Sequence, residues 1–141
     1  MKAPTSPART FALVVGASLA LGGVLGFFYS ASFATGDATL TDREAVLGLL
    51  DVNGWHNLVH LSSGVLGLLV AGSFRGARAY AGGLGVVYAV VAIAGLVVGD
   101  GESLVGLLPI NTADNVLHVL ISAGGLAAYF ASPSEPAPST V

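Results

Sequence analysis

The chain has 141 residues, of which 54% are hydrophobic and only 9% charged, and it contains no cysteine. Its mean hydropathy of +0.82 is higher than the core of a water-soluble domain of this length requires, so the composition indicates a membrane protein whose main partner is the lipid bilayer. The lack of cysteine excludes disulfides, thiolate metal sites and thiol nucleophiles. The net charge of -3 and the lack of a basic cluster argue against nucleic acid as a partner.

Four apolar stretches predict membrane-spanning helices, because crossing a hydrocarbon layer of ~30 Å takes roughly 20 apolar residues. In chain order these spans cover residues 11–33, 55–74, 79–98 and 111–131. The predicted fold is therefore all-α, a four-span transmembrane helical bundle that forms a single domain over residues 11–131. Residues 1–10 are predicted to form a cytoplasmic tail. Residues 132–141, rich in Pro, Ser and Ala, are predicted to form a disordered cytoplasmic tail.

The first span has an alternative interpretation as a cleavable signal peptide. Lys2 and Arg9 precede an apolar run that ends in the small residues around Ala34, which is the order of a secretory signal. The apolar run extends over residues 11–33, however, whereas the core of a signal peptide has about 7 to 15 residues. This length favours a retained first span.

A segment that follows the first span occurs again later in the chain. Residues 42–60 and residues 100–118 share eight identical positions out of nineteen, which predicts an internal duplication. The second and fourth spans both enter from the same side, so the two halves should have parallel topology about an axis along the membrane normal. The Leu-rich stretches 47–50 and 104–108 are predicted to form short interfacial helical turns that cap the bundle.

Basic residues predict the orientation in the membrane, because Lys and Arg near span ends stay on the cytoplasmic side. Lys2 and Arg9 precede the first span, and Arg75 and Arg78 lie between the second and third spans. We therefore expect a multi-pass protein of the cell membrane with both termini in the cytoplasm. The duplicated segments then face outward.

Polar residues form one stripe on each of the second and fourth spans when these are drawn as helices of 100° per residue. We expect the two stripes to face each other, and a polar cluster of four asparagines to fix the register of the halves: Asn53, Asn57, Asn111 and Asn115. Pairs of small residues spaced by four are typical of close helix packing in lipid. Three such pairs occur, namely Gly22 with Gly26, Ala81 with Gly85, and Ala123 with Ala127.

Histidines suggest a metal site within these stripes. His56 and His60 are four residues apart, as are Asp114 and His118, and this spacing places each pair on one helix face. Brought together, the four residues form a candidate set of three imidazoles and one carboxylate, which suits zinc or a similar divalent metal. A haem held between His60 and His118 is a further alternative.

The favoured interpretation of the same residues is structural, with Asn and His side chains forming hydrogen bonds between helices. Transport is disfavoured because no span has a charged residue near its centre. Enzyme activity is disfavoured because the sequence contains no GxSxG, HExxH or phosphate-loop motif. We expect a non-enzymatic membrane protein.

Two strings carry a resemblance to a known family: GWHNLVHLSSGVLGLL at residues 54–69 and GDGESLVGLLPINTADNVLH at residues 99–118. They resemble the signature segments of a bacterial, mainly actinobacterial, membrane family known as domain of unknown function 4383, and the resemblance extends from Phe11 to Phe130. It implies a four-span membrane protein with no assigned activity or site residues. The expected function is a structural or accessory component, alone, as a homo-oligomer or with other membrane proteins. The alternative is an outward-facing metal- or cofactor-binding module that uses His60 and His118.

Overall fold

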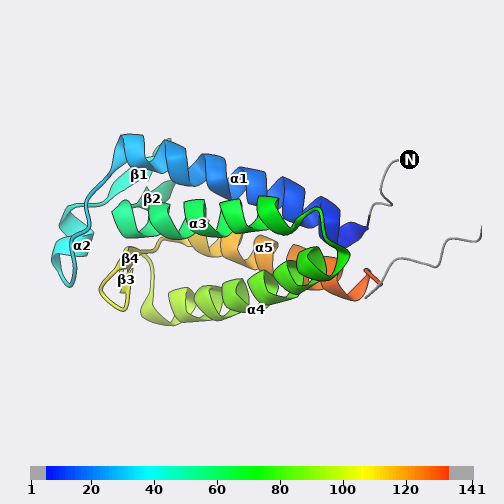
Figure 1. Ribbon diagram of the computed structural model, residues 1–141. Coiled ribbons are helices and arrows are strands. Elements are labelled where there is room, and N and C mark those ends of the chain that lie inside the picture. The colour runs from blue at the N-terminus through cyan, green and yellow to red at the C-terminus, as the bar shows by residue number, and fades with distance from the viewer. Residues whose placement is uncertain (1–5, 134–141) are drawn as a thin grey trace, which may run out of the picture.

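The computed structural model describes residues 6–133, which are mostly helical (Figure 1). Its helices are α1 (Pro7–Tyr29), α2 (Ala38–Thr41), α3 (Gly54–Val70), α4 (Phe74–Val98) and α5 (Thr112–Phe130). Its strands are β1 (Glu44–Val46), β2 (Leu50–Val52), β3 (Ser103–Leu104) and β4 (Leu108–Pro109). The N-terminal basic residue Lys2 and most of the predicted C-terminal tail lie outside the described residues.

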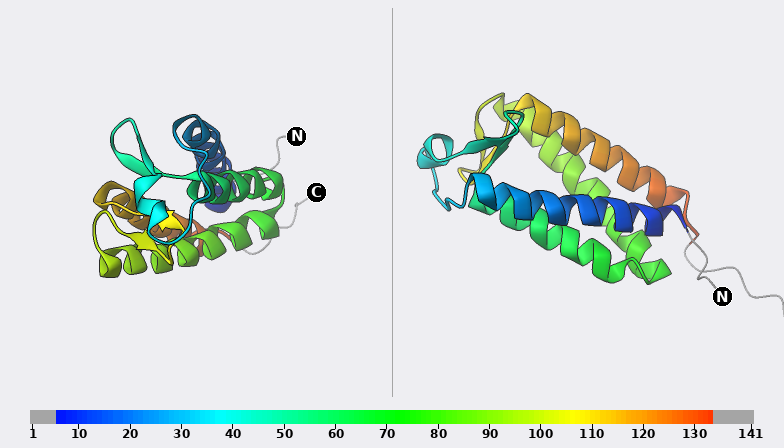
Figure 2. Two further views of the ribbon diagram at one scale, coloured as in Figure 1. Left: turned by 90° about the vertical axis from the view of Figure 1, so that its left-hand side faces the viewer. Right: turned by 90° about the horizontal axis from the view of Figure 1, so that it is seen from above.

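The four long helices lie side by side, with the short strands and α2 gathered at one end (Figures 1 and 2). The start of α1, the turn between α3 and α4, and the end of α5 lie at the opposite end. The most extensive helix contacts are those of α1 with α3 and of α4 with α5. The bundle therefore consists of two antiparallel helix pairs, α1 with α3 and α4 with α5.

Side chains at the helix starts explain where the helices begin. Ser6, Asn53, Ser73 and Asn111 each accept a hydrogen bond from the backbone N–H three residues on, which satisfies a donor that a helix start leaves without an intrahelical partner. Because of the caps at Ser6 and Ser73, α1 and α4 begin earlier than the spans predicted at residues 11 and 79. The ends of α3 and α5 differ from the predicted spans by at most four residues.

The buried faces of α1 and α4 follow one pattern. Each buried residue of α1 has a buried counterpart in α4 that is 69 positions later, and both sets consist mainly of small residues. The α1 set is Ala8, Phe11, Ala12, Gly16, Leu19, Gly23 and Gly26, and the α4 set is Ala77, Tyr80, Ala81, Gly85, Tyr88, Ala92 and Gly95. The same face thus serves both helix pairs.

Glycines on these faces allow close approach of the helix backbones. A Cβ atom added at Gly23 would lie 2.6 Å from the backbone nitrogen of Leu61 in α3. A Cβ atom added at Gly125 in α5 would lie 2.7 Å from the carbonyl oxygen of Ala81 in α4. Both separations are shorter than real Cβ contacts, so only glycine fits there.

Two of the predicted small-residue pairs do not lie wholly on the packing faces, because only Gly26 of the first pair and neither residue of the third pair is buried. Gly22 has open space around its Cα, and Ala123 and Ala127 are exposed, whereas Ala81 and Gly85 are buried. The packing faces lie one position away, at Gly23 in α1 and at Ser122 and Gly125 in α5. Spacing alone did not identify the face that is buried.

The predicted interfacial helical turns are wrong, because the Leu-rich stretches form β-hairpins. β1 pairs antiparallel with β2 in the register Ala45 opposite Asp51, and β3 pairs antiparallel with β4. Leu47 and Gly48 have φ of 55° and 72°, and Val105 and Gly106 have φ of 49° and 69°. Two successive left-handed residues reverse the chain, which a helical turn cannot do.

The polar stripes of α3 and α5 do not face each other along their whole length. A Cβ at Gly64 would contact the backbone of Gly16 and Ala20 in α1, and the Ser122 hydroxyl donates to the carbonyl oxygen of Gly85 in α4 at 2.8 Å. Away from the hairpins, both stripes therefore contact the partner helix of their own half. Only the ends beneath the hairpins meet across the molecule, as the histidines show below.

Within the described residues, two helices, α1 and α4, are long and apolar enough to cross a membrane. Only 33% of the residues in the most apolar stretch of each helix are buried, so most of their apolar side chains lie on the surface. Large exposed side chains include Leu21 at 63%, Phe28 at 83% and Val97 at 80%.

Candidate metal centre

The two hairpins and the helix starts below them are joined by reciprocal bonds. Asn53 caps α3 and donates from Nδ2 to the Leu107 carbonyl in the loop of the second hairpin at 2.7 Å. Asn111 caps α5 and donates from Nδ2 to the Leu49 carbonyl in the loop of the first hairpin at 2.8 Å. Because each asparagine holds the hairpin of the other half, the helix starts of α3 and α5 are fixed relative to each other.

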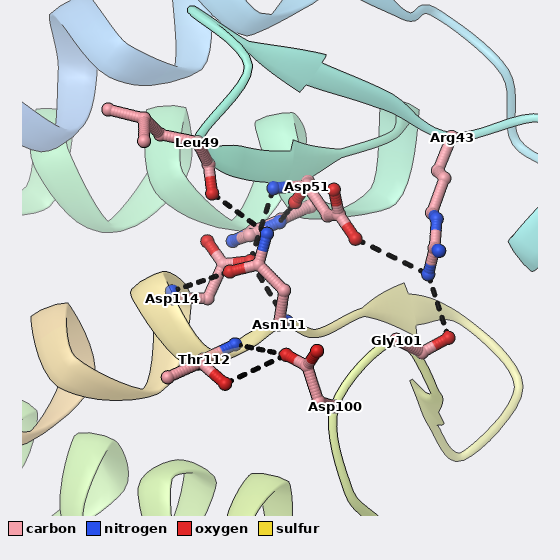
Figure 3. A network of polar contacts seen from close by, with 9 residues as sticks. Arg43, Leu49, Asp51, Asp100, Gly101, Asn111, Thr112 and Asp114 are labelled. Carbon is pink, nitrogen blue, oxygen red and sulfur yellow. Dashed lines mark hydrogen bonds and ion pairs between the residues drawn. The ribbon is translucent and has the colours of Figure 1, made fainter.

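Further polar contacts strengthen the layer that the two hairpins and the starts of α3 and α5 form, and Figure 3 shows them from close by. Arg43 joins the two halves through Nη1, which lies 3.3 Å from Asp51 Oδ2 and donates to the Gly101 carbonyl at 2.8 Å. Asp100 accepts from both the backbone N–H and the hydroxyl of Thr112.

Three histidines come together beneath this layer. His56, His60 and His118 each offer one ring nitrogen, and these three atoms lie within 4.8 Å of one another. His56 and His118 are buried, and His60 is partly buried. The first two residues come from one face of α3 and the third from α5, so the cluster depends on the bonds that fix the starts of these two helices relative to each other.

The closest pair of nitrogens has the spacing of metal ligands. His56 Nε2 lies 3.1 Å from His60 Nε2. Two nitrogens bound to one tetrahedral zinc at ~2.0 to 2.1 Å are about 3.3 Å apart. Only a small adjustment would therefore bring an ion between them.

His56 is held in the tautomer whose Nε2 has a lone pair, which can accept a hydrogen bond from His60 Nε2 at 3.1 Å or bind an ion. Its Nδ1 lies 2.8 Å from the carbonyl oxygen of Asp51, which can only accept a hydrogen bond. In a neutral ring the proton is therefore on Nδ1, and Nε2 has the lone pair. Histidines that bind metals commonly use such a contact with a backbone carbonyl to fix their orientation.

Two buried polar atoms near His118 have no hydrogen-bond partner within the described residues, namely His118 Nδ1 and the hydroxyl of Tyr88. The rings of His118 and Tyr88 pack edge to face with centroids 5.2 Å apart. Both residues line a small cavity of about 50 Å³, together with His56 and His60. Unpaired buried polar groups are costly, and a bound ion or water is the usual remedy.

Asp114, the fourth residue of the predicted set, is not part of this cluster. Its Oδ2 accepts from the backbone N–H of Asp51 at 3.1 Å and from that of Asn111 at 3.2 Å (Figure 3). Asp114 thereby completes the capping box of α5 and holds β2. This position, the third residue of a helix, favours capping over metal binding.

The remaining two asparagines of the predicted polar cluster are buried, each against the partner helix of its own pair. Asn57 lies against Gly26 of α1 and donates from Nδ2 to the Ser30 carbonyl at 2.7 Å. Asn115 likewise lies against Gly95 of α4. The four asparagines are thus divided between two tasks, and Asn57 and Asn115 do not meet.

Sequence reasoning did not identify Tyr88 or the Asp51 carbonyl as neighbours of the histidines. The signal for Tyr88 was its position 69 residues after Leu19, on the buried face that α1 and α4 share. A backbone carbonyl leaves no signal in the sequence.

The fold and the site define a mostly helical protein in which two helices can cross a membrane and three histidines gather beneath paired hairpins. The chain belongs to the family described as domain of unknown function (DUF4383), whose model matches residues 9–131. No curated protein and no solved structure matches the chain.

Proposed function

We propose that the protein crosses the membrane with all four long helices and that it arose by duplication of a helix pair with its hairpin. The apolar surfaces of α1 and α4 support the first part, because a core helix of a water-soluble protein would bury most of them. The shorter helices α3 and α5 have 17 and 19 residues, which corresponds to about 25 to 28 Å at 1.5 Å per residue.

Shared features of the two halves support the duplication. The caps Asn53 and Asn111 and the left-handed residues Leu47 and Val105 are each separated by 58 positions. The buried faces of α1 and α4 are separated by 69 positions. The longer connection of the first half, which contains α2, accounts for the difference.

We propose that the protein binds one transition-metal ion through His56, His60 and His118, at the outward end of the bundle. The observation that carries this proposal is the approach of three imidazole nitrogens to within 4.8 Å, with His56 oriented by the Asp51 carbonyl. Imidazole ligands suit zinc, copper, iron and nickel, and we take zinc as the reference ion. The role is binding without catalysis.

The size of the cavity at His118 favours a bare ion over haem. About 50 Å³ accommodates one or two water molecules, and a porphyrin between His60 and His118 would displace Tyr88 and the hairpins.

The test is the metal content of the protein, purified without chelator from cells grown with added zinc, copper, iron and nickel. We expect about one ion per chain in the wild type, its loss in His60→Asn and His118→Asn, and its retention in Asp114→Asn. Protons compete for the imidazoles, so retained metal should fall as the pH is lowered. A metal-free wild type would overturn the proposal and leave a structural or accessory component as the function.

A further inference from the structure

Two cavities flank the histidines, and they occupy equivalent places in the two halves. One is a groove of about 320 Å³ between α1, α5 and the first hairpin, and it reaches His56 and His60. The other is the cavity of about 50 Å³ between α4, α3 and the second hairpin. The hairpin residues Leu50 and Val52 of the groove correspond to Leu108 and Ile110 of the small cavity.

The difference in volume has its cause in three helix positions. Ser18, Leu19 and Gly22 of α1 line the groove. The residues 69 positions later, Val87, Tyr88 and Val91 of α4, line the small cavity and fill it. Larger side chains thus close one copy of the site, and smaller ones keep the other open.

Glycine at position 22 contributes to the open groove. A Cβ atom added at Gly22 would meet nothing within 4 Å, so the backbone there needs no glycine for packing. Its counterpart Val91 has a side chain that occupies the equivalent space. The groove is therefore open because of a side chain that is missing, and a larger residue at position 22 would fill it.

The shape and chemistry of the groove are those of a site for a single-chain amphiphile. It follows α1 from Val15 to Leu25, about 15 Å at 1.5 Å per residue, and its walls are mainly apolar. The apolar part is continuous with the exposed surface of α1, where Leu25 is 54% exposed. The polar residues His56, His60 and Asp114 lie at the end beneath the hairpin.

We propose that this groove binds one fatty acid, with its chain along α1 and its carboxylate at the ion held by the histidines. The inference rests on the proposed metal site. Three neutral imidazoles leave a divalent ion with its full charge and an open coordination position, and a carboxylate supplies both a negative charge and an oxygen ligand. The chain enters from the lipid side, where α1 exposes apolar residues.

The test uses the full chain in lipid nanodiscs and a dodecanoic acid with a photoreactive diazirine at the end of its chain. We expect saturable labelling at the end of the groove away from the histidines, around Val15 and Ile121, with competition by dodecanoic acid and no competition by dodecane. Gly22→Phe should reduce labelling at least tenfold with unchanged metal content. The matched control is Gly83→Phe, because Gly83 is also an exposed helix glycine with nothing within 4 Å, and it should label as the wild type.

A second measurement reports on the carboxylate itself. With cobalt in the site, dodecanoic acid should change the visible absorption of the ion, and dodecane should not. Labelling that is equal in Gly22→Phe and Gly83→Phe overturns the inference while the metal site stands. Saturable labelling of a wild type that carries no metal overturns both the metal site and the carboxylate contact.

Discussion

At the scale of single residues, a contact between an asparagine and a glycine occurs once in each half of the chain. Asn57 lies against Gly26, and Asn115 lies against Gly95. In each half the amide lies so close to the glycine Cα that a methyl group on that carbon would overlap the amide oxygen. The pairs set the distance between α1 and α3 and between α4 and α5 beneath the hairpins.

Gly26→Ala and Gly95→Ala should therefore each lower the free energy of unfolding by about 2 kcal/mol, because the new methyl group forces the helices apart. The matched control is Gly22→Ala on the same helix, where the methyl group meets nothing. That substitution should be neutral or stabilising by up to about 1 kcal/mol, since alanine is the better helix former. Thermal unfolding in detergent followed by circular dichroism measures all three. Equal effects of Gly22→Ala and Gly26→Ala would contradict this contact.

Hairpins are the elements that distinguish this structure from a plain bundle of helices. The first hairpin holds Asp51, whose carbonyl orients His56, and the second holds Leu107, whose carbonyl receives Asn53. The connection that contains α2 also links the two halves, since the Thr39 hydroxyl donates to the Gly106 carbonyl in the second hairpin at 2.8 Å. The hairpins therefore position the histidine cluster as well as cover it.

Val105→Gly tests the hairpin conformation. Val105 is 86% exposed and has φ of 49°, so its side chain contributes little packing and its backbone is strained. A left-handed conformation costs a β-branched residue about 1 to 2 kcal/mol, and glycine removes this cost at some loss of chain entropy. We expect Val105→Gly to raise the melting temperature slightly. The same change at Leu104, which is buried in β3, should lower it.

The sign of the Val105→Gly effect is informative. In a helical turn, glycine is less favourable than valine, so a lower melting temperature for this variant would contradict the hairpin.

At the scale of the whole molecule, the described basic residues lie mainly at one end and the acidic residues at the other, and Arg43 at the hairpin end is the exception. Arg9 and Arg78 lie at the end that holds the turn between α3 and α4, where Arg78 donates to the Ser132 carbonyl at 3.1 Å. Acidic residues gather at the hairpin end, where Asp51 and Asp100 form contacts of the outer layer. This division agrees with basic residues in the cytoplasm and the proposed metal site on the outer side.

Reporter fusions check this orientation. A reporter inserted after Arg78 or joined to Val141 should be active only in the cytoplasm, and one inserted after Gly101 should be active only outside. The physical reason is the cost of moving arginines across the bilayer during insertion. A cytoplasmic signal from the insertion at Gly101 would reverse the orientation, and the groove and the histidines would then open inward.

The sequence by itself determined the long helices, the recurring segment with its paired asparagines and the presence of His56 and His60 on one helix face. These features depend on local periods of hydrophobicity and on spacings of a few residues, which any helix converts into a face. The family resemblance also came from the residues alone and is confirmed by the match over residues 9–131.

Tertiary structure alone decided the rest. The hairpins could not be predicted because Leu47 and Val105 adopt a left-handed conformation that their own chemistry disfavours and that contacts with the other half must stabilise. The position of His118 beside His56 depends on the reciprocal bonds of Asn53 and Asn111, which join residues more than 50 positions apart. The spacing of Asp114 from His118 predicted a metal ligand. In the structure its carboxylate instead accepts hydrogen bonds from the backbone N–H groups of Asn111, at the start of its own helix, and of Asp51 in β2.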